Sequence, residues 1–287
     1  IALKIMLNRI FTSIILASLL LTILLFSHPL LIGALFTLIF IYGYYEWLKI
    51  SCNNIKKIYF SFFLMLAAMF LLLEYSSVFL VRSLTYFSLT LWLFIFLILI
   101  FNPSYLKKNI TNNSEIFGFI LIITAWYMAI SLGYTSVTIT QNSYKYLIFS
   151  STELSPLNYY YLFIITLVSL SDISGYVIGR IFGKRKLYES ISPNKTYEGF
   201  IASIIFPTLI FYCYFILFQS YSLLITDILF MLLCCIYCTI GDLLVSTLKR
   251  CFNAKDTGNL LPGHGGVLDR LDSYLPVIAI IQFWIFI

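Results

Sequence analysis

Long apolar runs separated by short polar segments make up most of the chain. Nine runs stand out, at residues 10–26, 30–48, 58–73, 83–101, 116–133, 159–178, 199–218, 224–248 and 274–287. A helix needs about 20 mostly apolar residues to cross a bilayer. The pattern therefore predicts an all-α, polytopic integral membrane protein with about nine transmembrane helices. The last run has only 14 residues, so we expect it to be tilted or only partly embedded.

Composition supports this prediction and excludes a soluble fold. Of the 287 residues, 61% are apolar and only 10% are charged, whereas a soluble domain carries roughly a quarter charged residues. Little chain remains for domains outside the membrane, so any chemistry must lie on helices and short loops. We read the first run as a transmembrane helix rather than a signal peptide, because further runs follow it.

The positions of the basic residues predict an orientation. With the N-terminus in the cytoplasm, sixteen of the 18 Lys and Arg residues lie on the cytoplasmic side, and only Arg82 and Lys145 lie outside. Cytoplasmic loops are usually rich in Lys and Arg. We therefore expect a multi-pass protein of the cell (plasma) membrane, in which the polar loops after the sixth and eighth runs face the cytoplasm.

Several polar residues and cysteines inside or beside the apolar runs have simple interpretations. Cys235 and Cys238 have a CxxC spacing but lie within an apolar run without a nearby His, which favours packing over a redox or zinc site. Glu46 and Glu74 are expected to be solvated interfacial carboxylates at helix ends, and Asp227 an interfacial residue near the outer end of the eighth run.

Two segments after residue 170 interrupt the apolar pattern. In the first, Asp172 ends an apolar run, where an acid is costly unless it pairs or binds a cation; pairing with Arg180 is one interpretation. Gly179 and Gly183 permit close approach of backbone or ligand. Ser192, Lys195 and Glu198 follow, and part of this stretch also resembles the start of a helix.

The second segment concentrates charge and glycine between residues 242 and 273. On a helix, Asp242, Ser246, Lys249 and Arg250 share one face. The remaining candidates are Lys255, His264, Gly265, Gly266, Asp269, Arg270 and Asp272. Carboxylates suit Mg²⁺ that shares its coordination with phosphates, and the cations and glycine N–H groups suit phosphate oxygens. The combination indicates phosphoryl or nucleotidyl transfer at a membrane surface.

The stretch from Ser246 to Asp272 resembles the signature of the phosphatidate cytidylyltransferase (CDP-diacylglycerol synthase) family. Its matching positions are Ser246, Lys249, Arg250, Lys255, Asp256, His264, Gly265, Gly266, Asp269, Arg270 and Asp272, and the earlier segment also fits from Asp172 to Gly199. Two mild departures are Gly175, where Ala is common, and Asn194, where Lys is usual. The motifs cover roughly the last 120 residues, and the rest of the chain is similar only in hydropathy.

This resemblance implies that CTP and phosphatidate are converted to CDP-diacylglycerol and diphosphate at a cytoplasmic, Mg²⁺-dependent site. It implies Asp242, Asp269 and Asp272 as metal ligands, and catalytic roles for Asp242, Lys249, Arg250, His264, Asp269 and Arg270. Substrate-binding residues would be Asp172, Arg180, Ser192, Lys195, Ser246, Lys255, Gly265 and Gly266. A second monovalent or divalent cation and a homodimer are compatible with the family, and no nucleic acid is expected as a partner.

Accordingly, residues 1–150 would form about five N-terminal transmembrane helices, and residues 151–287 a C-terminal catalytic transmembrane region with two cytoplasmic polar loops. Two alternatives remain open. A CTP-dependent polyprenol kinase would transfer the γ-phosphoryl group instead. A cation or proton transporter using Asp172 and Asp242 is less favoured. Transport predicts acids near the midplanes of several helices in both halves of the chain, and the first half has no acid at such a position.

Orientation can be tested by cysteine labelling. Cysteines introduced at Lys184 and Lys255 should react with an impermeant reagent only from the cytoplasmic side, because both positions lie in the basic loops. Labelling of either position only from outside would contradict the predicted topology.

Overall fold

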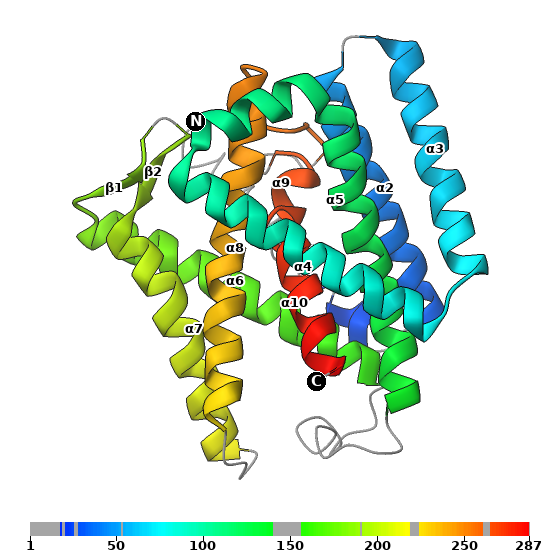
Figure 1. Cartoon of the computed structure of the whole chain (residues 1–287). Coiled ribbons are helices and arrows are strands. Elements are labelled where there is room, and N and C mark those ends of the chain that lie inside the picture. The colour runs from blue at the N-terminus through cyan, green and yellow to red at the C-terminus, as the bar shows by residue number, and fades with distance from the viewer. Residues whose placement is uncertain are drawn as a thin grey trace.

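The computed structural model describes residues 18, 21–25, 28–52, 54–139, 156–189, 191–218, 224–260 and 265–286. The chain is almost entirely helical in this part, as predicted (Figure 1). The helices are α2 (Pro29–Ser51), α3 (Ile55–Glu74), α4 (Val78–Phe101), α5 (Pro103–Ile139), α6 (Pro156–Phe182), α7 (Tyr197–Phe218), α8 (Ile225–Cys251), α9 (Leu268–Leu271) and α10 (Tyr274–Phe286). Two short strands, β1 (Lys186–Tyr188) and β2 (Ser192–Thr196), lie between α6 and α7.

Seven of the described helices, α2 to α8, are long and apolar enough to cross a membrane. They coincide with seven of the nine predicted runs and confirm a polytopic membrane protein. The predicted run at residues 10–26 lies outside the described residues, apart from Ser18 and residues 21–25. The exact number of spans and the side of the N-terminus stay predictions.

The short helix α10 explains why the last run looked too short for a span. It has 13 residues, packs against α4, α5 and α8, and is buried along most of its length. The apolar side chains of α10 therefore pack mainly against other helices of the bundle.

Helices α5 and α8 form the centre of the bundle. Within their spans, 67% and 61% of residues are buried, compared with 17% in the peripheral helix α3. Trp47 of α2 is buried and donates a hydrogen bond from Nε1 to the Ser114 carbonyl oxygen of α5 at 2.9 Å. Cys235 and Cys238 of α8 are buried and free, which confirms that they serve packing.

Helix starts are fixed by side-chain caps. Asn54 caps α3, and Ser77 caps α4 by accepting a hydrogen bond from the Leu80 N–H. Asp227 accepts a hydrogen bond from the Leu224 N–H at 2.9 Å and is only 8% exposed. Asp227 therefore lies in the first turn of α8, near the helix end where an interfacial residue was predicted, and its carboxylate caps the helix.

Glycines allow α6 and α7 to approach very closely. Gly175 and Gly179 lie on α6 and Gly183 directly follows its end, at four-residue spacing. A Cβ atom on any of them would meet α7 or Thr196 within 3.1 Å. On α7, a Cβ atom at Gly199 would lie 2.7 Å from the Gly175 carbonyl oxygen. Small residues at such spacing are typical of close helix pairs in membranes.

The hairpin of β1 and β2 is the one departure from an all-α chain in the described part. The strands are antiparallel, with Lys186 opposite Thr196. Tyr188 donates a hydrogen bond from its hydroxyl to the Leu99 carbonyl oxygen at 2.8 Å, and Glu198 accepts one from the Lys184 N–H at 3.1 Å. These contacts fix the hairpin against the C-terminal end of α4 and the first turn of α7.

The polar segments gather at one end of the bundle (Figure 1). The C-terminal ends of α2, α4 and α8 lie at this end together with the hairpin, opposite the C-terminus of the chain. Arg250, near the end of α8, donates a hydrogen bond from Nε to the Ile191 carbonyl oxygen of the hairpin at 3.2 Å. The two polar segments of the sequence are thereby brought side by side.

The close α6–α7 contact predicts a cost for Gly199→Ala. The new methyl group would meet backbone atoms, the Gly175 carbonyl oxygen at 2.7 Å and Gly179 Cα at 3.0 Å, so we expect a loss of about 1–3 kcal/mol in stability. Gly33→Ala on α2 is the matched control, since its nearest atom would be at 3.8 Å. Thermal unfolding in detergent measures both, and equal melting temperatures would contradict the contact.

Candidate active site

A polar cavity of about 830 Å³ lies between α6, α7, the hairpin, the C-terminal part of α8 and the α9 segment. Acidic and basic side chains line it in equal number, five of each. They are Asp172, Asp242, Asp256, Asp269 and Asp272, with Arg180, Lys186, Lys195, Lys249 and Arg270. Its volume falls in the range of small-molecule sites, and its lining suits a ligand that carries several charges.

One wall of the cavity comes from α6 and α7. The glycines of the α6–α7 contact line this wall, so that backbone replaces side chains there. Asp172 interacts electrostatically with Asp242, Lys195 and Arg270. Arg180 donates a hydrogen bond to the Tyr176 hydroxyl at 2.9 Å, rather than forming the ion pair with Asp172 that the sequence left open.

The facing wall begins with Asp242 of α8. Its Oδ1 accepts a hydrogen bond from the Ser246 hydroxyl at 3.1 Å, which confirms that the two residues share a helix face. Its Oδ2 forms an ion pair with Lys195 Nζ of β2 at 2.6 Å. Both partners are partly buried, so this pair links the two polar segments across the cavity.

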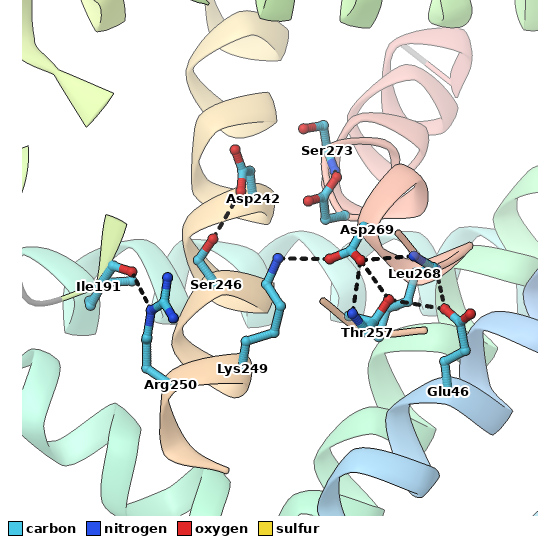
Figure 2. A network of polar contacts seen from close by, with 12 residues as sticks. Glu46, Ile191, Asp242, Ser246, Lys249, Arg250, Thr257, Leu268, Asp269 and Ser273 are labelled. Atoms are coloured by element: carbon cyan, nitrogen blue, oxygen red, sulfur yellow. Dashed lines mark hydrogen bonds and ion pairs between the residues drawn. The ribbon is translucent and has the colours of Figure 1, made fainter. Parts of the chain in front are cut away.

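Asp269 is the centre of a hydrogen-bond network (Figure 2). Its Oδ1 accepts from Lys249 Nζ at 2.7 Å. Its Oδ2 accepts from the Thr257 N–H at 2.8 Å, the Thr257 hydroxyl at 3.0 Å and the Gly266 N–H at 3.0 Å. Burial alone would raise the pKa of Asp269, but these donors and the charge of Lys249 hold it below its ordinary value.

Asp272 lies between α9 and α10 and is 8% exposed. Its Oδ1 accepts a hydrogen bond from the Ser273 N–H at 2.7 Å. Burial, followed by repulsion from Asp242 and Asp172, raises the pKa of Asp272 well above its ordinary value. Its backbone carbonyl packs directly on Gly241, where a Cβ atom would collide with it. Three carboxylates from three segments therefore approach one another in the cavity.

The other predicted site residues take different positions. Ser192 and Arg270 line the cavity. Arg250 binds the hairpin backbone, Lys255 is exposed, and neither lines the cavity that the described residues form. Gly265 has a φ of +83°, and the neighbouring Gly266 contributes its N–H to Asp269. The predicted role of His264 lies outside the described residues.

The structure also adds residues to which the sequence assigned no role in the site. Asp256 and Lys186 line the cavity. Asp256 matches the family signature, and Lys186 belongs to the basic run Lys184-Arg185-Lys186. Thr257 and Glu46 belong to the Asp269 network. The prediction that Glu46 is a solvated carboxylate was wrong, since it is 2% exposed, whereas Glu74 is exposed as predicted.

The donor set has the chemistry of a divalent-cation site. Among the described residues, no group of three or more His, Cys, Asp or Glu side chains already has the geometry of a bound metal. Asp172, Asp242 and Asp272 nevertheless offer hard oxygen donors that repel one another within one cavity. Mg²⁺ fits such a set, because it retains waters and shares coordination with phosphates.

Comparison with known proteins identifies the family. The model of the cytidylyltransferase family matches residues 7–287. The chain belongs to the cytidylyltransferase family. This membership confirms the resemblance found in the motifs and extends it over the N-terminal half, where only hydropathy was similar.

Curated relatives of this cytidylyltransferase-family chain carry the name phosphatidate cytidylyltransferase. The protein of Staphylococcus haemolyticus is 43% identical over 129 residues, which are 43% of this chain and 48% of the relative. That of Bacillus subtilis is 42% identical over 124 residues, or 43% and 46% of the two chains. That of Staphylococcus aureus is 39% identical over 125 residues, or 43% and 48%. The chain thus spans about half the length of the curated relatives it matches.

Proposed function

We propose that this protein is a phosphatidate cytidylyltransferase, which converts CTP and phosphatidate to CDP-diacylglycerol and diphosphate on the cytoplasmic face of the cell membrane. The observation that carries the proposal is the cavity of about 830 Å³ with five acidic and five basic side chains, at one end of an apolar helix bundle. Family membership and the names of the relatives support the same activity.

The position of the cavity favours a lipid as one substrate. Helix α6 contributes Asp172, Tyr176 and Arg180 to the cavity, and the same helix exposes Ile173 and Ile181 at 60% and 65% on its surface. An amphiphile can therefore lie with its acyl chains along α6 while its phosphate reaches the cations of the cavity. A nucleotide would enter from the aqueous side.

The basic residues of the cavity would lower the repulsion between two anionic substrates. Arg180 and Lys195 lie on the wall of α6 and the hairpin, and Lys249 and Arg270 on the wall of α8 and α9. Phosphate oxygens bound between these walls would be neutralised and aligned for attack of the phosphatidate oxygen on the α-phosphorus of CTP. The attacking phosphate is already ionised, so a general base has little to contribute.

Mg²⁺ would be held by Asp242 and Asp272, with Asp172 facing them across the cavity. When bound, the ion would neutralise phosphate charge and polarise the P–O bonds. Asp269, the third ligand expected from the sequence, can join this set only if its Oδ1 releases Lys249. In the arrangement seen here, Asp269 holds Lys249 and the backbone of Thr257 and Gly266 in place.

Replacing either central carboxylate should abolish most activity. Asp242→Asn and Asp269→Asn should lower cytidylyl transfer by about 100-fold or more. Each change removes a carboxylate charge and weakens the ion pair that positions a lysine beside the reacting phosphates. Both proteins should still insert into membranes. Glu74→Gln, at the exposed end of α3, is the matched control. Near-normal transfer by either Asp variant would remove that residue from the proposed machinery.

The proposed reaction itself can be tested with two labelled forms of CTP. Detergent-purified protein, phosphatidate and Mg²⁺ should yield labelled lipid from α-labelled CTP and labelled diphosphate from γ-labelled CTP. Label in lipid only from γ-labelled CTP, with polyprenol as acceptor, would instead identify a CTP-dependent polyprenol kinase. No labelled lipid from folded protein under either condition would contradict the proposal.

A further inference from the structure

Glu46 is a buried acid that the proposed chemistry does not use. It lies in the C-terminal part of α2, is 2% exposed, and contacts residues more than 200 positions away in the sequence. No ion pair of Glu46 occurs among the described residues. Burying a carboxylate without a cation is costly unless hydrogen bonds compensate. Hydrogen bonds from the surrounding chain must therefore compensate the burial of the Glu46 carboxylate.

Among the described residues, the hydrogen bonds of Glu46 go to the segment that carries the site. Its Oε2 accepts from the Leu268 N–H, the first residue of α9, at 2.8 Å. The same oxygen accepts from the Thr257 hydroxyl at 3.0 Å (Figure 2). Leu268 immediately precedes Asp269, so Glu46 anchors the chain next to the centre of the network.

Thr257 connects the two carboxylates. Its hydroxyl lies 3.0 Å from Glu46 Oε2 and 3.0 Å from Asp269 Oδ2. A hydroxyl has only one proton to donate, so the two acids share this donor. Glu46 and Asp269 are thereby coupled through a single side chain, and Asp269 in turn binds Lys249 at 2.7 Å.

Two glycines enclose the Glu46 carboxylate. A Cβ atom at Gly258 would collide with Oε1, and one at Gly266 would collide with Oε2 and with the Thr257 hydroxyl oxygen. Oε1 itself is buried and has no hydrogen-bond partner among the described residues. The backbone at Gly258 and Gly266 therefore packs directly against this acid, and no side chain larger than hydrogen fits at either position.

We propose that Glu46 is a positioning residue for the active site. It holds Thr257 and Leu268, and through them it sets Asp269 and Lys249 toward the cavity. This role rests on the proposed function, because Lys249 and Asp269 are the groups placed at the reacting phosphates. Helix α2, from the N-terminal half of the chain, thereby contributes to the geometry of a site formed by the C-terminal half.

Kinetics of Glu46 variants test the proposal. Glu46→Ala leaves the Leu268 N–H and Thr257 without their acceptor, so kcat should fall by about 10- to 100-fold. The KM for CTP should stay within about threefold, because the opposite wall with Arg180 and Lys195 is untouched. Glu46→Gln retains one acceptor oxygen and should recover part of the loss, while Glu74→Gln should match the unmodified protein.

Amide hydrogen exchange gives a second readout that needs no activity. In Glu46→Ala, the N–H groups of Thr257, Gly266 and Leu268 should exchange faster, while those of α6 and α7 should not change. If Glu46→Ala does not fold, Glu46→Gln and Thr257→Val carry the test, with smaller changes in the same direction. Exchange that matches the unmodified protein in all variants, or an unchanged kcat, would overturn the proposal.

The two measurements separate this inference from the proposed function. Transfer by the unmodified protein, together with unchanged kcat in every Glu46 variant, would overturn the positioning role alone. Absence of transfer by the unmodified protein would overturn the proposed reaction, and the exchange rates would still decide whether Glu46 holds the segment. A rise in KM for CTP at constant kcat would assign Glu46 to ground-state binding and contradict the role stated here.

Discussion

A partly buried ion pair joins Lys249 of α8 to Asp269 of α9, with only 14% and 11% of the two side chains exposed. Such a pair survives in an apolar bundle only when its remaining hydrogen-bonding capacity is satisfied. Asp269 meets that condition through Thr257 and Gly266. The positions of Thr257 and Gly266 are therefore tied to the need to compensate the Asp269 carboxylate. Thr257, Glu46 and Leu268 are connected to this ion pair by successive hydrogen bonds that begin at Asp269.

The same constraint applies across the cavity. Asp242 is compensated by Lys195 and Ser246, which fixes the hairpin to α8, and Arg250 adds a bond to the hairpin backbone. Close packing of α6 on α7 through glycines brings the hairpin and Asp172 to the cavity, beside Asp242. The pairs Lys195–Asp242 and Lys249–Asp269 thus hold neighbouring segments together while they face the cavity. The site is preorganised by its own charges, which is what electrostatic stabilisation of a reacting phosphate requires.

Much of this arrangement could be predicted from sequence because two signals are strong. Apolar runs identified α2 to α8, and the spacing of Asp242 and Ser246 placed both on one helix face. The hairpin could not be found this way, since its strands are short and contain Pro193, and Tyr188 is held by Leu99 from a distant helix. Glu46 was missed because its partners, Thr257 and Leu268, lie far away in sequence. The sequence around an acid at a helix end does not distinguish an acid exposed to water from one covered by a folded loop.

In the proposed function, both substrate phosphates bind in the cavity between the α6–α7 wall and the Lys249–Asp269 network. The most direct measurement is an experimental structure of the protein with Mg²⁺ and a non-transferable CTP analogue. We expect the triphosphate to lie among Arg180, Lys195, Lys249 and Arg270, with the ion bound to Asp242 and Asp272. A nucleotide bound elsewhere, with this cavity containing only water, would contradict the proposed function.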